Sequence, residues 1–102
     1  MVDFVRELQT TLRTGKITIG AKETIKLVLN GKPKLVIMAA NARDDIRVDL
    51  ERYCKLAKIP LYIFPGSSWE LGLICKRPHM VSALAILDPG ESSILDIVKG
   101  DK

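Results

Sequence analysis

Three short stretches of the chain carry residue types and spacings that suit the binding of an anion. The first is Gly20, Ala21, Lys22 and Glu23, where a short β-branched segment runs directly into a helical pattern. The free N–H groups and the dipole at the start of a helix favour an anion, and Lys22 and Lys26 add positive charge. An ordinary turn with solvated lysines explains the same residues. The stretch matches neither a Walker A loop nor a dinucleotide fingerprint.

The second stretch, Ala40 to Arg43, follows the most apolar run of the chain. The side chain of Asn41 can hydrogen-bond a base edge or tolerate a left-handed turn, and Arg43 can hold a phosphate through two N–H groups. Ala42 separates the two. The alternative is that Asn41 serves only as a turn residue and Arg43 as a surface charge.

The third stretch comprises Arg77, Pro78, His79, Met80 and Val81 and is preceded by a lysine. It combines cations, a rigid proline, an imidazole and apolar tips. An exposed mixture of this kind suits an unstacked nucleotide, which packs on flat or apolar groups. His79 is the single histidine of the chain, and a purely structural role for it is the alternative.

Apolar periodicity and turn residues predict the elements that position these stretches. The predicted helices cover residues 3–14, 21–30, 44–57 and 67–75, with a short last helix capped by Ser92 or Ser93, and the predicted strands cover residues 16–19, 35–40, 61–64 and 81–87. Asp3 is the expected N-cap of the first helix, Gly31 the C-cap of the second, and Ser67 with Glu70 a capping box for the fourth. This alternation predicts an α/β fold, an αβα sandwich with a small four-stranded sheet.

The same periodicity predicts which side chains face the core. The expected inward positions of the second and third helices are Ile25, Val28, Leu29, Ile46, Leu50, Tyr53, Cys54 and Ala57. Trp69 is expected to pack rather than to stack on a ligand. Cys54 and Cys75 are expected to be buried free thiols, since they form no CxxC pair.

Length and charge limit the remaining possibilities. The 102 residues suit one domain spanning 1–102. The net charge is +4, and residues 1–43 alone carry eight basic and three acidic side chains, a pattern that fits a polyanion-facing side. We expect no membrane span and no secretory signal, and therefore a cytoplasmic chain. We also expect no metal site, no cofactor and no enzymatic activity.

Five segments, in this order and spacing, carry a resemblance to a known family. They are 15–20 (GKITIG), 34–41 (KLVIMAAN), 59–62 (IPLY), 68–72 (SWELG) and 81–92 (VSALAILDPGES). Over essentially its whole length the chain resembles the L-seven-Ae family of kink-turn RNA-binding ribosomal proteins, and within it the archaeal L-thirty-e branch, to which the step Arg77-Pro78-His79 is similar. The resemblance implies a three-layer αβα sandwich with a four-stranded mixed sheet.

The resemblance also implies a function, namely a structural constituent of the large ribosomal subunit that binds kink-turn rRNA. Residues 20–23 would then enter the groove at the sheared G·A pairs, with Lys22 and Lys26 at phosphates or base edges. Asn41 would contact a base with Ala42 beside it and Arg43 on the backbone, and residues 77–81 would lie under the extruded nucleotide. Many relatives carry Asn-Glu at the start of the second helix, where this chain has Lys22-Glu23 as the ribosomal branch commonly does. His79 stands where the eukaryotic branch has Phe and should stack less strongly.

Other readings of the sequence stay open. A core protein of RNA-guided RNA-modification particles would use the same surface. A small-ligand enzyme would need convergent titratable groups, which one histidine and unpaired carboxylates do not supply. A protein-interaction module would use the neutral third helix. The expected partners are rRNA and large-subunit proteins but no membrane, and the free chain is expected to be monomeric.

Overall fold

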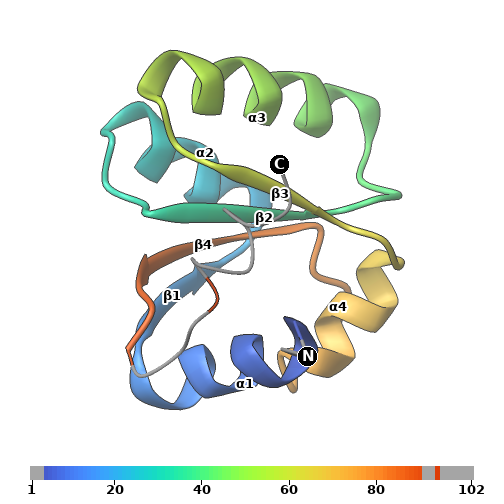
Figure 1. Ribbon diagram of the computed structural model, residues 1–102. Coiled ribbons are helices and arrows are strands. Elements are labelled where there is room, and N and C mark those ends of the chain that lie inside the picture. The colour runs from blue at the N-terminus through green and yellow to red at the C-terminus, as the bar shows by residue number, and fades with distance from the viewer. Residues whose placement is uncertain (1–3, 91–93, 95–102) are drawn as a thin grey trace.

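The computed structural model describes residues 4–90 and Ile94, which form four helices and four strands (Figure 1). The helices are α1 (Phe4–Thr14), α2 (Ala21–Leu29), α3 (Asp44–Ala57) and α4 (Ser68–Ile74), and the strands are β1 (Lys16–Ile19), β2 (Leu35–Ala39), β3 (Leu61–Phe64) and β4 (Ala83–Asp88). The predicted αβα sandwich is confirmed, and most predicted bounds lie within two residues of the observed ones. The predicted caps at Asp3 and at Ser92 or Ser93 lie outside the described residues.

The four strands form one mixed sheet in the order β1-β4-β2-β3. β2 and β3 run parallel, whereas β4 runs antiparallel to both β1 and β2. The strands β1, β2 and β3 therefore point in the same direction. Their carboxyl ends and the amino end of β4 meet at one edge of the sheet, which we call the strand-end edge.

Alternate residues of the central strand β2 face opposite sides, and all five are buried. Leu35 and Ile37 join the core beneath α1 and α4, together with Leu8, Leu71 and the buried Ile94. Val36 and Met38 join the second core beneath α2 and α3. Figure 1 shows these two helix pairs on opposite sides of the sheet. A continuous apolar strand is typical of a sheet covered on both faces, as the sequence predicted.

The helix ends depart from prediction in small ways. Asn30 is the C-cap of α2, and Gly31 follows it with a φ of 66°, a conformation that glycine adopts without strain. The prediction that Leu29 and Ala57 face inward was wrong, because both are exposed and Leu29 is 62% accessible. Ala57 is the last residue of α3, and Leu29 directly follows Val28, which takes the inward position in the last turn of α2. None of the helices in the described part of the chain is long and apolar enough to cross a bilayer.

Candidate nucleic-acid interface

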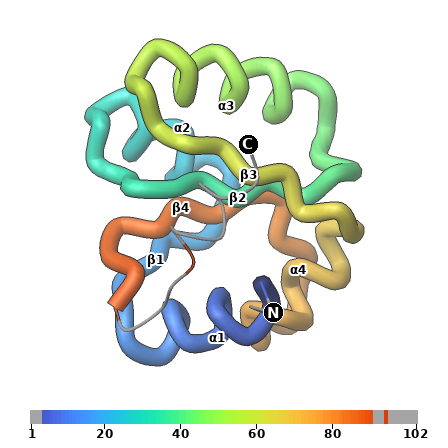
Figure 2. The backbone as a smooth tube through the Cα atoms, viewed as in Figure 1, coloured from blue at the N-terminus to red at the C-terminus, as the bar shows by residue number. Residues whose placement is uncertain are grey.

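The strand-end edge collects the chain stretches singled out from the sequence. Backbone hydrogen bonds hold them there: the Gly20 N–H donates to the Ala83 carbonyl at 3.0 Å, and the Ala39 N–H donates to the Ser82 carbonyl at 2.8 Å. The Ala40 N–H bonds the Phe64 carbonyl at 3.0 Å. Figure 2 shows the chain turning on the same side of the molecule after β2 and after β3, next to α4. The topology therefore brings all three stretches to one edge.

At the first stretch, β1 runs into α2 through a single residue. Gly20 has a φ of 123° and a ψ of 139°, a backbone conformation that other residues rarely adopt. Among the described residues no side chain caps α2, so its first N–H groups stay available to a ligand. Lys22 and Glu23 are exposed, and the Glu23 carboxylate lies 3.9 Å from the Lys26 Nζ. That contact is long and solvated, so Lys26 remains able to meet an anion.

At the second stretch, Asn41 has a structural contact that the sequence did not predict. Its side-chain Oδ1 accepts a hydrogen bond of 2.8 Å from the backbone N–H of Ser68, the first residue of α4. The side-chain oxygen of Asn41 therefore holds the start of α4 in place, while the two N–H donors of its side-chain NH₂ group stay available to a ligand. Ala42 is only 7% accessible and belongs to the core beneath α2 and α3, so its side chain supports the turn rather than facing outward.

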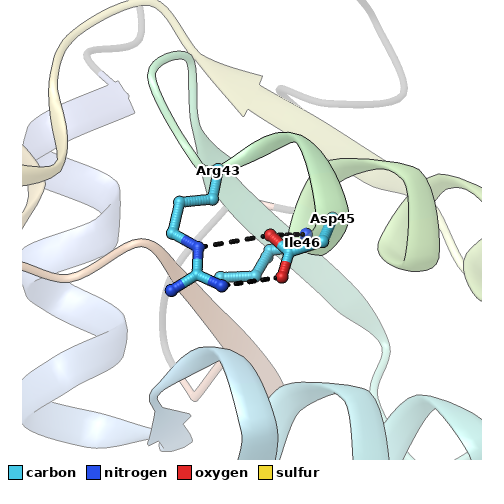
Figure 3. Close-up of polar contacts among 3 residues, drawn as sticks. All are labelled: Arg43, Asp45 and Ile46. Atoms are coloured by element: carbon cyan, nitrogen blue, oxygen red, sulfur yellow. Dashed lines mark hydrogen bonds and ion pairs between the residues drawn. The ribbon is translucent and has the colours of Figure 1, made fainter.

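Arg43 is held by a neighbouring carboxylate (Figure 3). Its Nη2 lies 2.8 Å from Oδ2 of Asp45 and its Nε 3.3 Å from Oδ1, and that oxygen also accepts from the Ile46 N–H at 2.9 Å. The hydrogen bond to Arg43, together with that from Ile46, holds the pKa of the Asp45 carboxyl below its usual range, and the same pairing raises the pKa of Arg43. The pair is exposed to solvent, with side-chain accessibilities of 78% and 62%. A phosphate that binds Arg43 would have to share the guanidinium with Asp45 or displace the Asp45 carboxylate from it.

The third stretch connects the end of α4 to the start of β4, and it runs back alongside α4 on the way. Arg77, Pro78, His79 and Met80 are exposed. His79 Nδ1 lies 3.0 Å from the Met80 carbonyl oxygen, and it donates a hydrogen bond to that oxygen in the tautomer that carries the proton on Nδ1. Val81 is 1% accessible, so its side chain anchors the loop and does not face outward.

Two contacts explain why this loop lies close to α4. The Val81 N–H donates to the Ser68 carbonyl at 3.1 Å. The backbone carbonyl of His79 passes so close to Gly72 that a side chain at position 72 would collide with it. Glycine at this position therefore permits the close approach of the loop to the helix.

Trp69 is the clearest departure from expectation at this edge. We predicted that it packs, but it is 59% accessible. The buried positions of this region are Ser68, Leu71, Gly72 and Cys75, which share one face of α4 and its C-cap, and Trp69 lies outside that face. This spacing was visible in the sequence and could have corrected the prediction. Because the neighbouring Ser68 bonds Asn41, the backbone of Trp69 lies next to the candidate interface.

Ser68 was also missed from the sequence. It links the second and third stretches, since its N–H donates to Asn41 and its carbonyl accepts from Val81. No sequence pattern predicts this role, because it depends on a hydrogen-bond partner, Asn41, that lies 27 residues away in the chain.

The described residues contain no cluster of three or more His, Cys, Asp or Glu side chains able to hold a metal ion. Both cysteines are buried free thiols, as predicted. Burial raises the pKa of each to about 11, so neither thiol is ionised near neutral pH. The exposed groups of the edge are therefore charged and hydrogen-bonding side chains rather than metal ligands or thiolates.

Comparison with known proteins identifies the family. The model of the ribosomal protein L7Ae/L30e/S12e/Gadd45 family matches residues 3–96. The chain belongs to this family. The large ribosomal subunit protein eL30 of Pyrobaculum neutrophilum is 61% identical over 99 residues, covering 97% of this chain and 98% of that protein. The eL30 protein of Sulfurisphaera tokodaii is 47% identical over 96 residues, covering 94% and 91%. These family members are ribosomal proteins and not enzymes.

A solved structure supports the fold alone. A protein of unknown function from Bacillus halodurans superposes with a TM-score of 0.72 and covers 93% of this chain and 92% of its own. Its sequence is 23% identical. The family fold is thus retained at low sequence identity, and the likeness carries no statement about function.

Proposed function

We propose that the chain is a structural constituent of the large ribosomal subunit, located on cytoplasmic ribosomes, that binds a kink-turn of rRNA at its strand-end edge. The names of the family members at 61% and 47% identity support the ribosomal part of the proposal. One observation carries the RNA-binding part: the uncapped start of α2, the Asn41 turn and the loop 77–80 lie together at one edge of the sheet. Folded RNA, bent at an internal bulge, presents phosphates and splayed bases over such a surface.

The residues would divide the work by chemistry. Lys22, Lys26 and Arg77 neutralise phosphates, which makes the affinity fall with salt. The Asn41 NH₂ donates to a base edge, and the exposed loop with His79 and Met80 packs under an extruded base. Because Asn41 and the loop are both fastened to Ser68, their spacing is fixed before RNA arrives. A fixed spacing favours one RNA shape over another.

The test is a titration of the full chain with a kink-turn RNA and with a straight duplex of matched length, at two salt concentrations. We expect tighter binding to the kink-turn and weaker binding of both at high salt. Lys22→Ala and Arg77→Ala should each cost about 1–3 kcal/mol, which is roughly 5- to 150-fold in affinity. Lys55→Ala is the matched control, because Lys55 is also an exposed lysine and lies in the last turn of α3, away from the strand-end edge. Equal affinity for the two RNAs would overturn the shape-reading claim.

The single tryptophan offers a second readout. Trp69 is exposed beside the Asn41 contact, so its fluorescence should change when the kink-turn binds. Association with large ribosomal subunits in cell extracts, rather than with small guide RNAs, separates the ribosomal role from a role in RNA-modification particles. Predominant association with guide RNAs would contradict the ribosomal assignment.

A further inference from the structure

Exposed apolar side chains gather at the end of the molecule opposite the strand-end edge. Both α2 and α3 begin near that edge and run away from it, so that their last turns lie together at the other end (Figure 1). Between these turns lies a cavity of about 190 Å³, which we call the far groove. It is lined by Val28, Leu29, Tyr53, Leu56 and Ala57.

The far groove exposes apolar surface that the fold does not require. Leu29 is 62% accessible and Leu56 is 75% accessible. Single exposed leucines are common on protein surfaces, but adjacent ones that line a hollow mark interaction sites more often. A cavity of about 150 Å³ accommodates a benzene molecule. The far groove is therefore large enough for one aliphatic or aromatic side chain of a partner.

Basic residues adjoin the lining of the far groove along the chain. The neighbouring cations are Lys32, Lys34, Arg52, Lys55 and Lys58, all with exposed side chains. Lys55 complements the dipole at the end of α3, whereas Lys32 and Lys34 lie beyond the last turn of α2. In the described part of the chain none of the five cations forms an ion pair, and Glu51 is the single acidic residue in the two segments 26–34 and 51–60.

From this arrangement we propose that the far groove binds an acidic amphipathic segment of a partner protein. An apolar side chain of the segment would fill the hollow, and its carboxylates would meet the neighbouring cations. Four of the five lining side chains are aliphatic and Tyr53 is half-buried, so the groove offers a base little flat surface for stacking and suits an aliphatic side chain better. A second copy of this chain is disfavoured, since two basic surfaces would face each other. The proposal concerns the end opposite the RNA and does not depend on the proposed RNA binding.

The test is an NMR titration of the full-length ¹⁵N-labelled chain with a synthetic amphipathic helical peptide of leucine and glutamate. Two matched peptides replace either all glutamates by lysine or all leucines by serine. We expect saturable binding of the first peptide alone, with the largest amide shifts at Leu29, Tyr53 and Leu56. Leu56→Ser should weaken binding at least tenfold. Leu73→Ser on α4 should leave it unchanged, although Leu73 is 72% accessible and thus equally exposed.

Several outcomes would overturn the proposal. Absence of binding, or equal binding of the serine-substituted peptide, would show that the hollow recognises no apolar side chain. Amide shifts centred on residues 77–80 would place the acidic peptide at the strand-end edge instead. Sedimentation that reports a dimer sensitive to Leu56→Ser would assign the groove to a second copy, and loss of RNA affinity in Leu56→Ser would assign it to RNA. Because Leu56 is exposed, the variant should fold, which circular dichroism verifies.

Discussion

The two ends of the molecule are built from the same helices and strands but hold their exposed groups differently. At the strand-end edge, hydrogen bonds tie segments that are distant in sequence, as between Asn41 and Ser68 and between Val81 and Ser68. At the far groove, leucines and lysines are exposed at and just beyond the last helical turns, and among the described residues none of these side chains forms an ion pair with another element. A rigid surface suits recognition of one RNA shape, whereas an adaptable one suits a flexible protein segment.

The largest expected difference between the two ends, in stability and in RNA affinity, comes from replacing one glycine at each end by alanine. Gly72→Ala places a Cβ against the His79 backbone carbonyl, so helix and loop must separate. We expect a loss of about 2–3 kcal/mol in the free energy of unfolding and a strong loss of kink-turn affinity. Gly31→Ala, near the far groove, meets open space and suffers only from its φ of 66°. It should cost about 1 kcal/mol and leave RNA affinity unchanged.

Urea denaturation monitored by circular dichroism measures both glycine variants. If the two variants lose equal stability, the close packing of the loop on α4 is not what distinguishes the strand-end edge. If Gly72→Ala loses stability but binds RNA normally, the loop is not part of the interface.

Two substitutions at Asn41 separate its structural function from its proposed function in binding RNA. Asn41→Ala removes the acceptor of the Ser68 N–H and should cost about 1–2 kcal/mol of stability, together with discrimination between kink-turn and duplex. Asn41→Asp keeps an acceptor but loses both donors and adds negative charge. It should therefore fold as stably as the original chain and still lose RNA affinity. Normal affinity in the stable Asp variant would remove the proposed base contact.

The sequence predicted the elements well and the contacts between them poorly. Apolar periodicity and the residues Gly15, Gly31 and Pro60 divide the chain locally, so element order and most bounds followed from short segments. The exposure of Trp69 could have been predicted from the spacing of the buried positions of α4. The exposure of Leu29 was not foreseen, because the neighbouring Val28 takes the inward position in the last turn of α2.

Similarly, three candidate residues have structural contacts that the sequence did not predict. Ala42 and Val81 lie in the predicted turns, yet their side chains are buried, and Asn41 also fixes α4. The far groove was invisible to sequence reasoning for the same reason: it forms only where the ends of two separate helices meet.

The two cysteines report on the two ends by their reactivity. Cys54 lies within α3 and is buried in the core beneath α2 and α3, whereas Cys75 is the C-cap of α4 and precedes the loop 76–81. Burial raises the pKa of each thiol to about 11, so both should react slowly with a disulfide reagent at pH 8. In single-cysteine chains we expect the thiol of Cys75 to react first, because a loop opens locally more easily than the interior of a helix. Faster reaction of Cys54 would mean that α3 opens before the loop does.

The same thiols give the stability a pH dependence of known sign. The folded state binds the thiol proton more tightly than the unfolded state, whose thiols titrate near their ordinary pKa of 9.0. The contribution is therefore fully present below about pH 8.5 and is lost as the pH rises through about 11. Urea midpoints measured between pH 8 and 11 should fall less in a Cys54→Ala, Cys75→Ala double variant, once corrected for its lower starting stability.

The smallest expected effect concerns Arg43, whose guanidinium is engaged by Asp45 at 2.8 Å. Asp45→Asn removes the carboxylate, so the arginine is free to meet a phosphate and one negative charge leaves the edge. We expect kink-turn affinity to rise about two- to fivefold at low salt, with the gain reduced at high salt because the contact is exposed. Asp44 offers the matched control: it pairs with Arg47 at 2.9 Å in the same helical turn. A gain of equal size in Asp44→Asn would show that removal of any nearby charge suffices and that Arg43 has no particular contact with RNA.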